Sequence, residues 1–130
     1  MVMSERFVQN AIADYLGRRE HYATNLRIKL ATEHDVDIRV RHNRYGRWFL
    51  IETKGETDSK SARSYSETMF IYSLGQIVTR MKSGARDNYG LGLPEPSAQI
   101  AIKRIPWRAA EKLHLHIFSD TKTQHVKMYD

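Results

Sequence analysis

The sequence predicts an α/β domain of the α+β type, in which a mixed β-sheet is flanked by helices. Two observations lead to this fold class. Apolar residues recur at helical spacing near the start of the chain and again between residue 61 and Gly84, and they alternate with polar residues in most of the other segments. The expected order is α-β-β-β-α-β-β. With 130 residues the chain suits one hydrophobic core, so a single domain is expected over residues 1–130.

The first helix is expected from Ser4 to about Arg19. Its apolar side chains Val8, Ile12 and Leu16 recur every four residues, and Ser4 is placed to cap the N-terminus.

Three strands are expected between His21 and Lys54. The alternating apolar residues are Leu26, Ile28 and Leu30, then Val36, Ile38 and Val40, then Phe49 and Ile51. Residues 43–46, Asn-Arg-Tyr-Gly, have the composition of a hairpin turn. The second and third strands should therefore pair antiparallel.

A long helix is expected after the polar loop of residues 55–61 and should end before Gly84. Its apolar stripe consists of Phe70, Leu74, Ile77, Val78 and Met81. Residues 83–97 contain three Gly and two Pro, and they are interpreted as a mobile connection without regular structure.

The C-terminal part is expected to return to the sheet. A fourth strand is predicted over Gln99–Ile105, followed by a short helical turn after Pro106. A hairpin should then join residues 113–117 to residues 126–128.

Composition limits the classes of function. The chain has 21 Lys and Arg against 15 Asp and Glu, a net charge of +6, which favours a polyanionic partner. It has no Cys, so disulfides, thiolate zinc sites and a Cys nucleophile are excluded. No apolar run approaches the roughly 20 residues of a membrane span, and the first residues lack the apolar core of a signal peptide. A cytoplasmic protein without a membrane partner is expected.

Three ionisable residues are expected to converge at one edge of the sheet. Asp37 begins the second strand, and Glu52 and Lys54 end the third. Because side chains alternate across a strand, Glu52 and Lys54 share one face while Ile51 and Thr53 occupy the other. The hairpin turn folds Asp37 back toward Glu52 and Lys54.

This combination suits phosphodiester hydrolysis. Two carboxylates are a preferred ligand set for Mg²⁺, which neutralises phosphate charge and lowers the pKa of bound water. Lys54 beside that water would orient the nucleophile or stabilise charge on phosphorus. The alternative is a set of surface ion pairs, in which Asp37 pairs with Arg39 or Arg41 and Glu52 pairs with Lys54.

The pattern resembles the PD-(D/E)xK, or restriction-endonuclease-like, nuclease superfamily. The resemblance covers most of the chain: a leading helix, a three-stranded meander bearing Asp37 and Glu52-x-Lys54, a long helix and a further strand. It implies that Asp37 and Glu52 bind Mg²⁺ or Mn²⁺, that the backbone carbonyl of Thr53 completes the site, and that Lys54 is the catalytic lysine.

One position departs from the family pattern. Val36 stands where the family usually has proline, and Asp35 is a competing candidate for the first acid. Strand alternation favours Asp37, although a register shift of two residues would place Asp35 on the same face.

Two further residues resemble those of some superfamily members. Gln76 matches a glutamine on the helix after the lysine motif, where it would orient a water or a phosphate; the alternative is a polar surface or interface residue. Glu5 lies three and seven residues before Val8 and Ile12, on the expected buried side of the first helix. Glu5 either contributes to a second metal site or is an acid favoured by the helix dipole.

Basic and aromatic residues surround the hairpin turn. They are Arg39, Arg41, Arg44 and Arg47, with His42, Tyr45 and Trp48. They form the candidate nucleic-acid contact, in which arginines bind phosphates and aromatics stack on bases, or else a solvated basic edge that prevents aggregation. A second, weaker basic group contains Lys103, Arg104, Trp107, Arg108 and Lys112. His114 and His116 are interpreted as surface or interface residues that share a strand face.

The expected function is that of a metal-dependent nuclease acting on DNA rather than RNA, of the endonuclease type used in defence, repair or recombination. The alternatives are a non-catalytic nucleic-acid-binding module and a subunit of a larger nuclease assembly. Small relatives such as Holliday-junction resolvases act as homodimers, so a homodimer on that substrate is a specific alternative.

Overall fold

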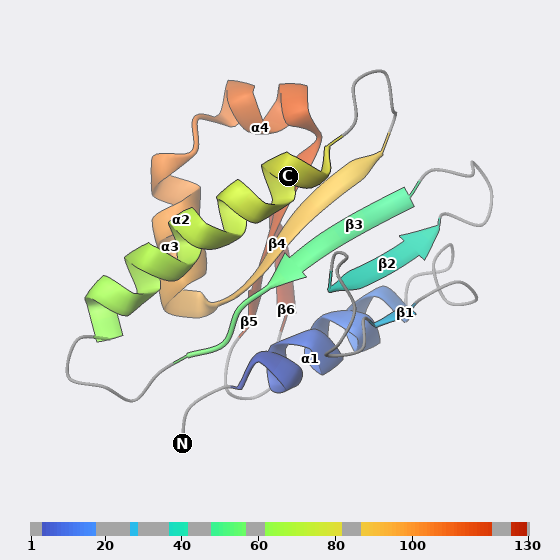
Figure 1. Ribbon diagram of the computed structural model, residues 1–130, viewed down its shortest axis with the longest axis horizontal. Helices are drawn as coiled ribbons and strands as arrows, with labels where there is room; N and C mark the ends of the chain where they lie inside the picture. Colours follow the sequence, from blue (N-terminus) through green and yellow to red (C-terminus); the bar gives the residue numbers. More distant parts are fainter. Residues whose placement is uncertain are drawn as a thin grey trace.

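The computed structural model describes residues 4–17, 27–28, 37–41, 48–56, 62–81, 87–120 and 126–129. Within these residues a mixed sheet of six strands, in the order β1-β2-β3-β4-β5-β6, is combined with helices on both of its faces (Figure 1). The predicted α+β class with a mixed, helix-flanked sheet is confirmed.

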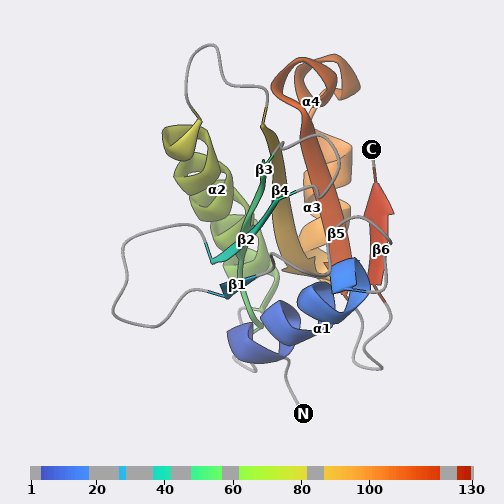
Figure 2. The ribbon, with the colours of Figure 1, turned by 90° about the vertical axis from the view of Figure 1, so that its right-hand side faces the viewer.

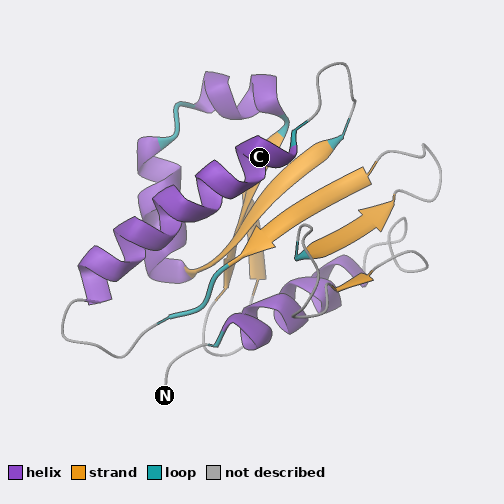
Figure 3. Cartoon of the chain, viewed as in Figure 1, coloured by secondary structure: helices purple, strands orange, loops and turns teal. Residues whose placement is uncertain are grey.

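The elements follow the chain in this order: α1 Glu5–Gly17, β1 Arg27–Ile28, β2 Ile38–Arg41, β3 Trp48–Thr53, α2 Ala62–Arg80, β4 Asn88–Pro94, α3 Glu95–Arg104, α4 Trp107–Leu113, β5 Leu115–Asp120 and β6 Val126–Tyr129. The strands β1, β2 and β3 form an antiparallel meander, and β5 pairs antiparallel with β6. The central pairs β3–β4 and β4–β5 are parallel (Figure 3). Both expected helices, the antiparallel pairing of the second and third strands and the C-terminal hairpin are therefore confirmed.

A mobile connection is predicted over residues 83–97, and this is wrong from Asn88 on, because strand β4 occupies the middle of the sheet there and helix α3 begins at Glu95. Residues 83–86 lie outside the described residues. Gly90 and Gly92 are buried. A Cβ atom on Gly90 would lie 2.8 Å from the Phe118 ring, and one on Gly92 would overlap the side chain of Ile12. These glycines mark close packing of β4 against its neighbours rather than flexibility.

The strand predicted over Gln99–Ile105 is also wrong, since these residues belong to helix α3 and its end. The proline-containing sequence at residues 94–96 suits a helix N-terminus, where a missing N–H costs nothing. Ala98, Ala101, Ile102 and Ile105 follow a spacing of three, four and seven residues, which is helical periodicity. The expected order α-β-β-β-α-β-β is thus replaced by one with α3 and α4 between β4 and β5.

Two apolar clusters hold the layers together, one on each face of the sheet. Helix α1 packs through Val8, Ile12 and Leu16 on one face, against residues that include Ile38, Val40, Phe49, Ile51 and Phe118. Helices α2 and α3 pack on the other face, against apolar residues of β4 and β5. Figure 2 shows α1 and α2 on opposite sides of the strands.

Helix α2 buries a narrower stripe than predicted. Phe70, Ser73 and Ile77 are buried and Leu74 is half-buried, whereas Val78 is 45% exposed. A stripe of this width leaves the flanking side chains of α2 free to contact the end of β3. No helix in the described segments is both long and apolar enough to cross a bilayer.

Candidate active site

Asp37 connects the start of β2 to the end of β3. Its carboxylate oxygen Oδ2 accepts a hydrogen bond from the backbone N–H of Thr53 at 2.8 Å and another from the Thr53 hydroxyl at 3.1 Å. The register pairs Ile38 with Ile51, so one residue further along Asp37 lies opposite Glu52. Asp37 is 4% exposed. The pairing of β2 with β3 therefore brings the buried side chains of Asp37 and Glu52 close together.

Glu52 is the more perturbed of the two acids. It is 3% exposed, and burial raises the pKa of its carboxyl from an ordinary 4.5 to about 7, with smaller contributions from the Asp37 charge and a hydrogen bond to Asp37. The positive charges of Arg80 and Lys54 act in the opposite direction on this pKa. Two acids and two cations thus interact electrostatically at the end of β3.

Helix α2 covers this acid pair with polar side chains. Arg80 Nε lies 3.7 Å from Glu52 Oε1, and Lys54 Nζ lies 5.6 Å from the centre of the Tyr72 ring. Tyr72, Gln76 and Arg80 are four residues apart, so they share one face on successive turns. Gln76 therefore occupies the turn between the two contacts.

Three polar atoms of this group have unused hydrogen-bonding capacity. Glu52 Oε1, Gln76 Oε1 and Arg80 Nε are buried, and none of them makes a hydrogen bond within the described residues. Buried polar atoms are rarely left in this state unless a water, an ion or a ligand completes them. This cluster of Asp37, Glu52, Gln76 and Arg80, with Lys54 beside it, is the candidate active site.

The arrangement fits a hard divalent cation. Mg²⁺ binds through one or two carboxylates and completes its shell with water and substrate phosphate. Asp37 and Glu52 would supply the carboxylates of such a site, and Glu52 Oε1 makes no hydrogen bond within the described residues. Across the described residues, no group of three or more His, Cys, Asp and Glu side chains is gathered at one point.

Thr53 is the last residue of β3, and Lys54 follows it directly. The Lys54 backbone N–H donates to the Gly92 carbonyl at 3.0 Å and extends the pairing with β4. Thr53 is fully buried. A Cβ atom on Gly92 would meet the Thr53 methyl group as well as Ile12 of α1, so Thr53 points toward the α1 face. Glu52 contacts Arg80 of α2, on the other face, as strand alternation predicts.

Glu5 does not lie where it was expected. It is exposed in the first turn of α1 rather than on the buried side, because the apolar contact of the helix begins only at Phe7 and Val8. As an acid in a first helical turn, Glu5 is favourably placed in the field of the helix dipole.

The predicted nucleic-acid contact is described only in part. Arg39 places its guanidinium carbon 4.6 Å from the centre of the Trp48 ring, on the neighbouring strand. Arg41 belongs to β2, where its backbone pairs with Trp48. Arg44, Tyr45 and Arg47 lie outside the described residues, as does the alternative acid Asp35.

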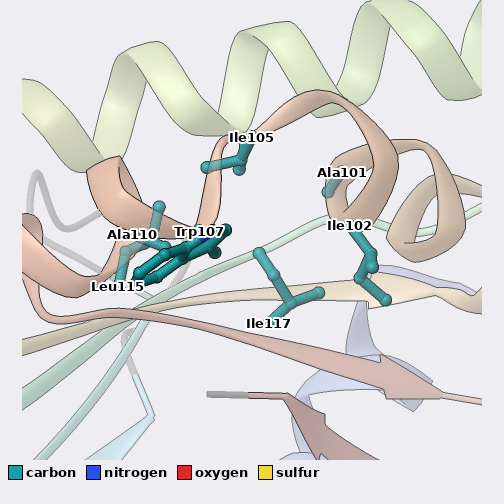
Figure 4. A pocket seen from close by; sticks show the side chains of 7 residues that line it. All are labelled: Ala101, Ile102, Ile105, Trp107, Ala110, Leu115 and Ile117. Carbon is teal, nitrogen blue, oxygen red and sulfur yellow. The ribbon is translucent and has the colours of Figure 1, made fainter.

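The second basic group lies elsewhere, on helices α3 and α4. Lys103, Arg104, Arg108 and Lys112 are exposed, and Trp107 is 68% exposed. A cavity of about 150 Å³ is formed by α3, α4 and β5 and is lined by Ala101, Ile102, Ile105, Trp107, Ala110, Leu115 and Ile117 (Figure 4). Its lining contains no ionisable side chain, so it offers no acid–base chemistry.

His114 and His116 do not share a strand face, contrary to the prediction. His114 ends α4 in a left-handed conformation with φ of 53°, whereas His116 lies in β5. The His116 ring is 5.4 Å from the Phe49 ring. The chain turns at His114 and separates the two side chains.

Arg80 is a site residue for which the sequence pattern predicted no role. Its signal was its position four residues after Gln76, on the same face of the long helix. This spacing indicates a role for Arg80 only when the structure shows that α2 brings Arg80 to Glu52 near the end of β3.

Comparisons with protein-family models, with curated proteins and with solved structures find no match. A functional assignment therefore has to be argued from the geometry of the site.

Proposed function

We propose that this protein is a metal-dependent nuclease that hydrolyses phosphodiester bonds in DNA. The observation that carries the proposal is the buried acid pair of Asp37 and Glu52, with an oxygen of Glu52 left without a hydrogen bond among the described residues. Strongly perturbed acids in contact with specific charged neighbours are typical of functional sites.

The order of the elements around the acid pair supports this proposal. A leading helix, an antiparallel meander of β1 to β3, a long helix and the strand β4 parallel to β3 follow one another. This is the order on which the resemblance to the PD-(D/E)xK superfamily rests. Of the motif residues, Asp37 directly precedes β2, Glu52 is the second-last residue of β3, and Lys54 directly follows β3.

Each residue has a distinct role in the proposed reaction. Asp37, Glu52 and the Thr53 carbonyl would hold Mg²⁺ or Mn²⁺, which when bound supplies positive charge to the phosphate and lowers the pKa of water. Lys54 would orient the attacking water or stabilise negative charge on the phosphate. Gln76, whose Oε1 is buried, would accept a hydrogen bond from that water.

The basic character of the chain supports a nucleic-acid substrate. The net charge is +6, and Arg39, two residues after Asp37 on β2, shares its strand face. A nucleic-acid strand with one phosphate bound to Arg39 would therefore have its neighbouring phosphates directed toward Asp37 and Glu52. DNA is favoured over RNA by the resemblance to restriction-endonuclease-like enzymes.

A second candidate is a non-catalytic nucleic-acid-binding module or a subunit of a larger nuclease assembly. The contact between Arg39 and Trp48 favours it, because arginine and aromatic side chains bind phosphates and stack on bases without any metal. A homodimer that acts on four-way DNA junctions is a specific form of the nuclease proposal.

The deciding experiment is a cleavage assay with Mg²⁺ or Mn²⁺ on duplex DNA, single-stranded DNA, a four-way junction and RNA. We expect Glu52→Gln to lower the cleavage rate by about 100-fold or more and to weaken Mn²⁺ binding. Lys54→Ala should lower the rate similarly while Mn²⁺ binding is retained. The control is Glu95→Gln, which removes an exposed acid at the start of α3.

Two results would contradict the nuclease proposal. One is metal-dependent cleavage that survives both Glu52→Gln and Lys54→Ala. The other is DNA binding by the wild-type protein without cleavage and without Mn²⁺ binding, which would establish the non-catalytic module instead.

A further inference from the structure

The contact between Arg80 and Glu52 differs from an ordinary salt bridge. The Nε–Oε1 distance is 3.7 Å, which is too long for a hydrogen bond. Both atoms are buried, and neither has a hydrogen-bond partner within the described parts of the chain. The two groups attract each other through their charges while their hydrogen-bonding capacity stays unused.

The side chain of Arg80 is also positioned so that it can move away from Glu52 toward solvent. Its side chain is 37% exposed, whereas that of Glu52 is 4% exposed. It projects from the last residue of α2, so the backbone that carries it is the end of a helix rather than its middle. The arginine can therefore withdraw toward solvent at small cost, whereas Glu52 is fixed by the sheet.

A nearby positive charge stabilises the ionised carboxylates of Asp37 and Glu52, both in the metal-free protein and when a metal ion is bound. Two buried carboxylates that lie opposite each other on paired strands repel, and burial adds the cost of removing each charge from water. Arg80 supplies one positive charge from the α2 side. A divalent cation would supply two, with ligand bonds that a guanidinium at 3.7 Å does not make.

We propose that Arg80 is the resident counter-ion of the acid pair, which a divalent cation displaces from Glu52 on binding. This inference rests on the proposed metal site and adds a regulatory property to it. Arg80 stabilises the metal-free protein but lowers its affinity for the metal, because the arginine and the metal compete for the same carboxylate and repel each other. Once displaced, Arg80 lies at the mouth of the site as a free cation for a substrate phosphate.

The test is Mn²⁺ titration by calorimetry at pH 8, together with thermal unfolding in EDTA. We expect Arg80→Gln to bind Mn²⁺ on the order of tenfold more tightly than the wild type, since it removes a like charge from the site. In EDTA the same variant should unfold at a lower temperature than the wild type. Excess Mn²⁺ should abolish this difference in unfolding temperature.

Three variants make the result specific. Arg80→Lys keeps the positive charge and should bind Mn²⁺ like the wild type. Arg108→Gln removes one charge from the exposed surface of α4 and should leave both Mn²⁺ affinity and stability in EDTA unchanged. Glu52→Gln should weaken Mn²⁺ binding, which locates the bound ion at the acid pair.

The outcomes separate this inference from the function on which it rests. Mn²⁺ binding to the wild type that Arg80→Gln leaves unchanged or weakens would overturn the role of Arg80 alone. Equal tightening by Arg108→Gln would also overturn it, because the effect would then come from net charge. Absence of Mn²⁺ binding to the wild type at pH 8 would overturn the metal site itself.

Discussion

At the scale of single residues, Glu52 is the site residue with the most strongly perturbed pKa. It is buried beside another acid, and the two cations near it do not fully offset the cost of its charge, so its pKa rises to about 7. A carboxyl group that ionises near neutral pH binds a proton or a metal ion in the same range. The protonation state of Glu52 therefore changes with pH near neutrality, and the proposed metal ion would compete with the proton for this carboxylate.

Because the pKa of Glu52 is higher in the folded protein than its ordinary value of 4.5, folding takes up protons between pH 4.5 and about 7. The stability that protonated Glu52 contributes is fully present below pH 4.5 and is lost as the pH rises through 7. In EDTA, we expect Glu52→Gln to unfold at a temperature higher than the wild type at pH 8, by on the order of 5 °C, and to show a smaller difference at pH 5.

The measurement for this residue is thermal unfolding by circular dichroism across that pH range. Glu67→Gln, at an exposed position in α2 beyond its first turn, should follow the wild type at every pH. A difference between Glu52→Gln and the wild type that does not change with pH would show that burial does not perturb the Glu52 carboxyl. Addition of Mn²⁺ at pH 8 should stabilise the wild type more than Glu52→Gln.

At the scale of elements, the site depends on how closely β4 approaches α1 and β3. Gly92 allows this approach, since a Cβ there would overlap Ile12 and crowd the Thr53 methyl group, and Thr53 in turn donates to Asp37. Packing at the centre of the sheet therefore sets the position of the first acid. Regular strands alone do not determine that position.

We expect Gly92→Ala to lower the free energy of unfolding by about 1–3 kcal/mol, because the added methyl group overpacks a tight region. Gly75→Ala is the matched control. A Cβ at Gly75 meets nothing within 4 Å, and alanine in a helix interior should raise the free energy of unfolding by about 0.5–1 kcal/mol. Urea unfolding measures both. Equal effects of the two substitutions would contradict the close packing at β4.

At the scale of the whole molecule, the net charge of +6 is expected to set how strongly the affinity for a polyanion depends on salt. Each phosphate that a cationic side chain neutralises releases condensed counterions, so affinity falls steeply with salt. Arg39, beside Trp48 and on the strand face of Asp37, is the described residue best placed for such a contact.

For binding to duplex DNA in EDTA, we expect affinity to fall by about 40-fold between 50 and 200 mM salt if three phosphates are contacted. Arg39→Ala should weaken binding and reduce the slope of log K against log salt by about 1. Fluorescence anisotropy with labelled DNA measures both quantities. A slope that Arg39→Ala leaves unchanged would place the phosphate contacts elsewhere on the protein.

The elements that could be predicted are those with a simple local pattern. Helix α1, helix α2 and the hairpin of β2 and β3 show clear periodicity or turn chemistry, and each was expected near its observed position. Strand β4 was not predicted, because the sequence alone does not distinguish a glycine in a buried strand, such as Gly90 or Gly92, from a glycine in a loop. Helix α3 was predicted as a strand because it contains two β-branched residues, Ile100 and Ile102, at the alternating spacing of a strand.

The sequence by itself determined that Asp37, Glu52 and Lys54 would stand at the ends of two paired strands, because alternation and a hairpin turn are local properties of the chain. Only the tertiary structure decided what covers them. Helix α2 packs on the sheet and brings Arg80 to Glu52, with Gln76 one turn earlier on the same helix face. The perturbed carboxyl of Glu52 arises from that burial, because desolvation depends on neighbours that no local pattern specifies.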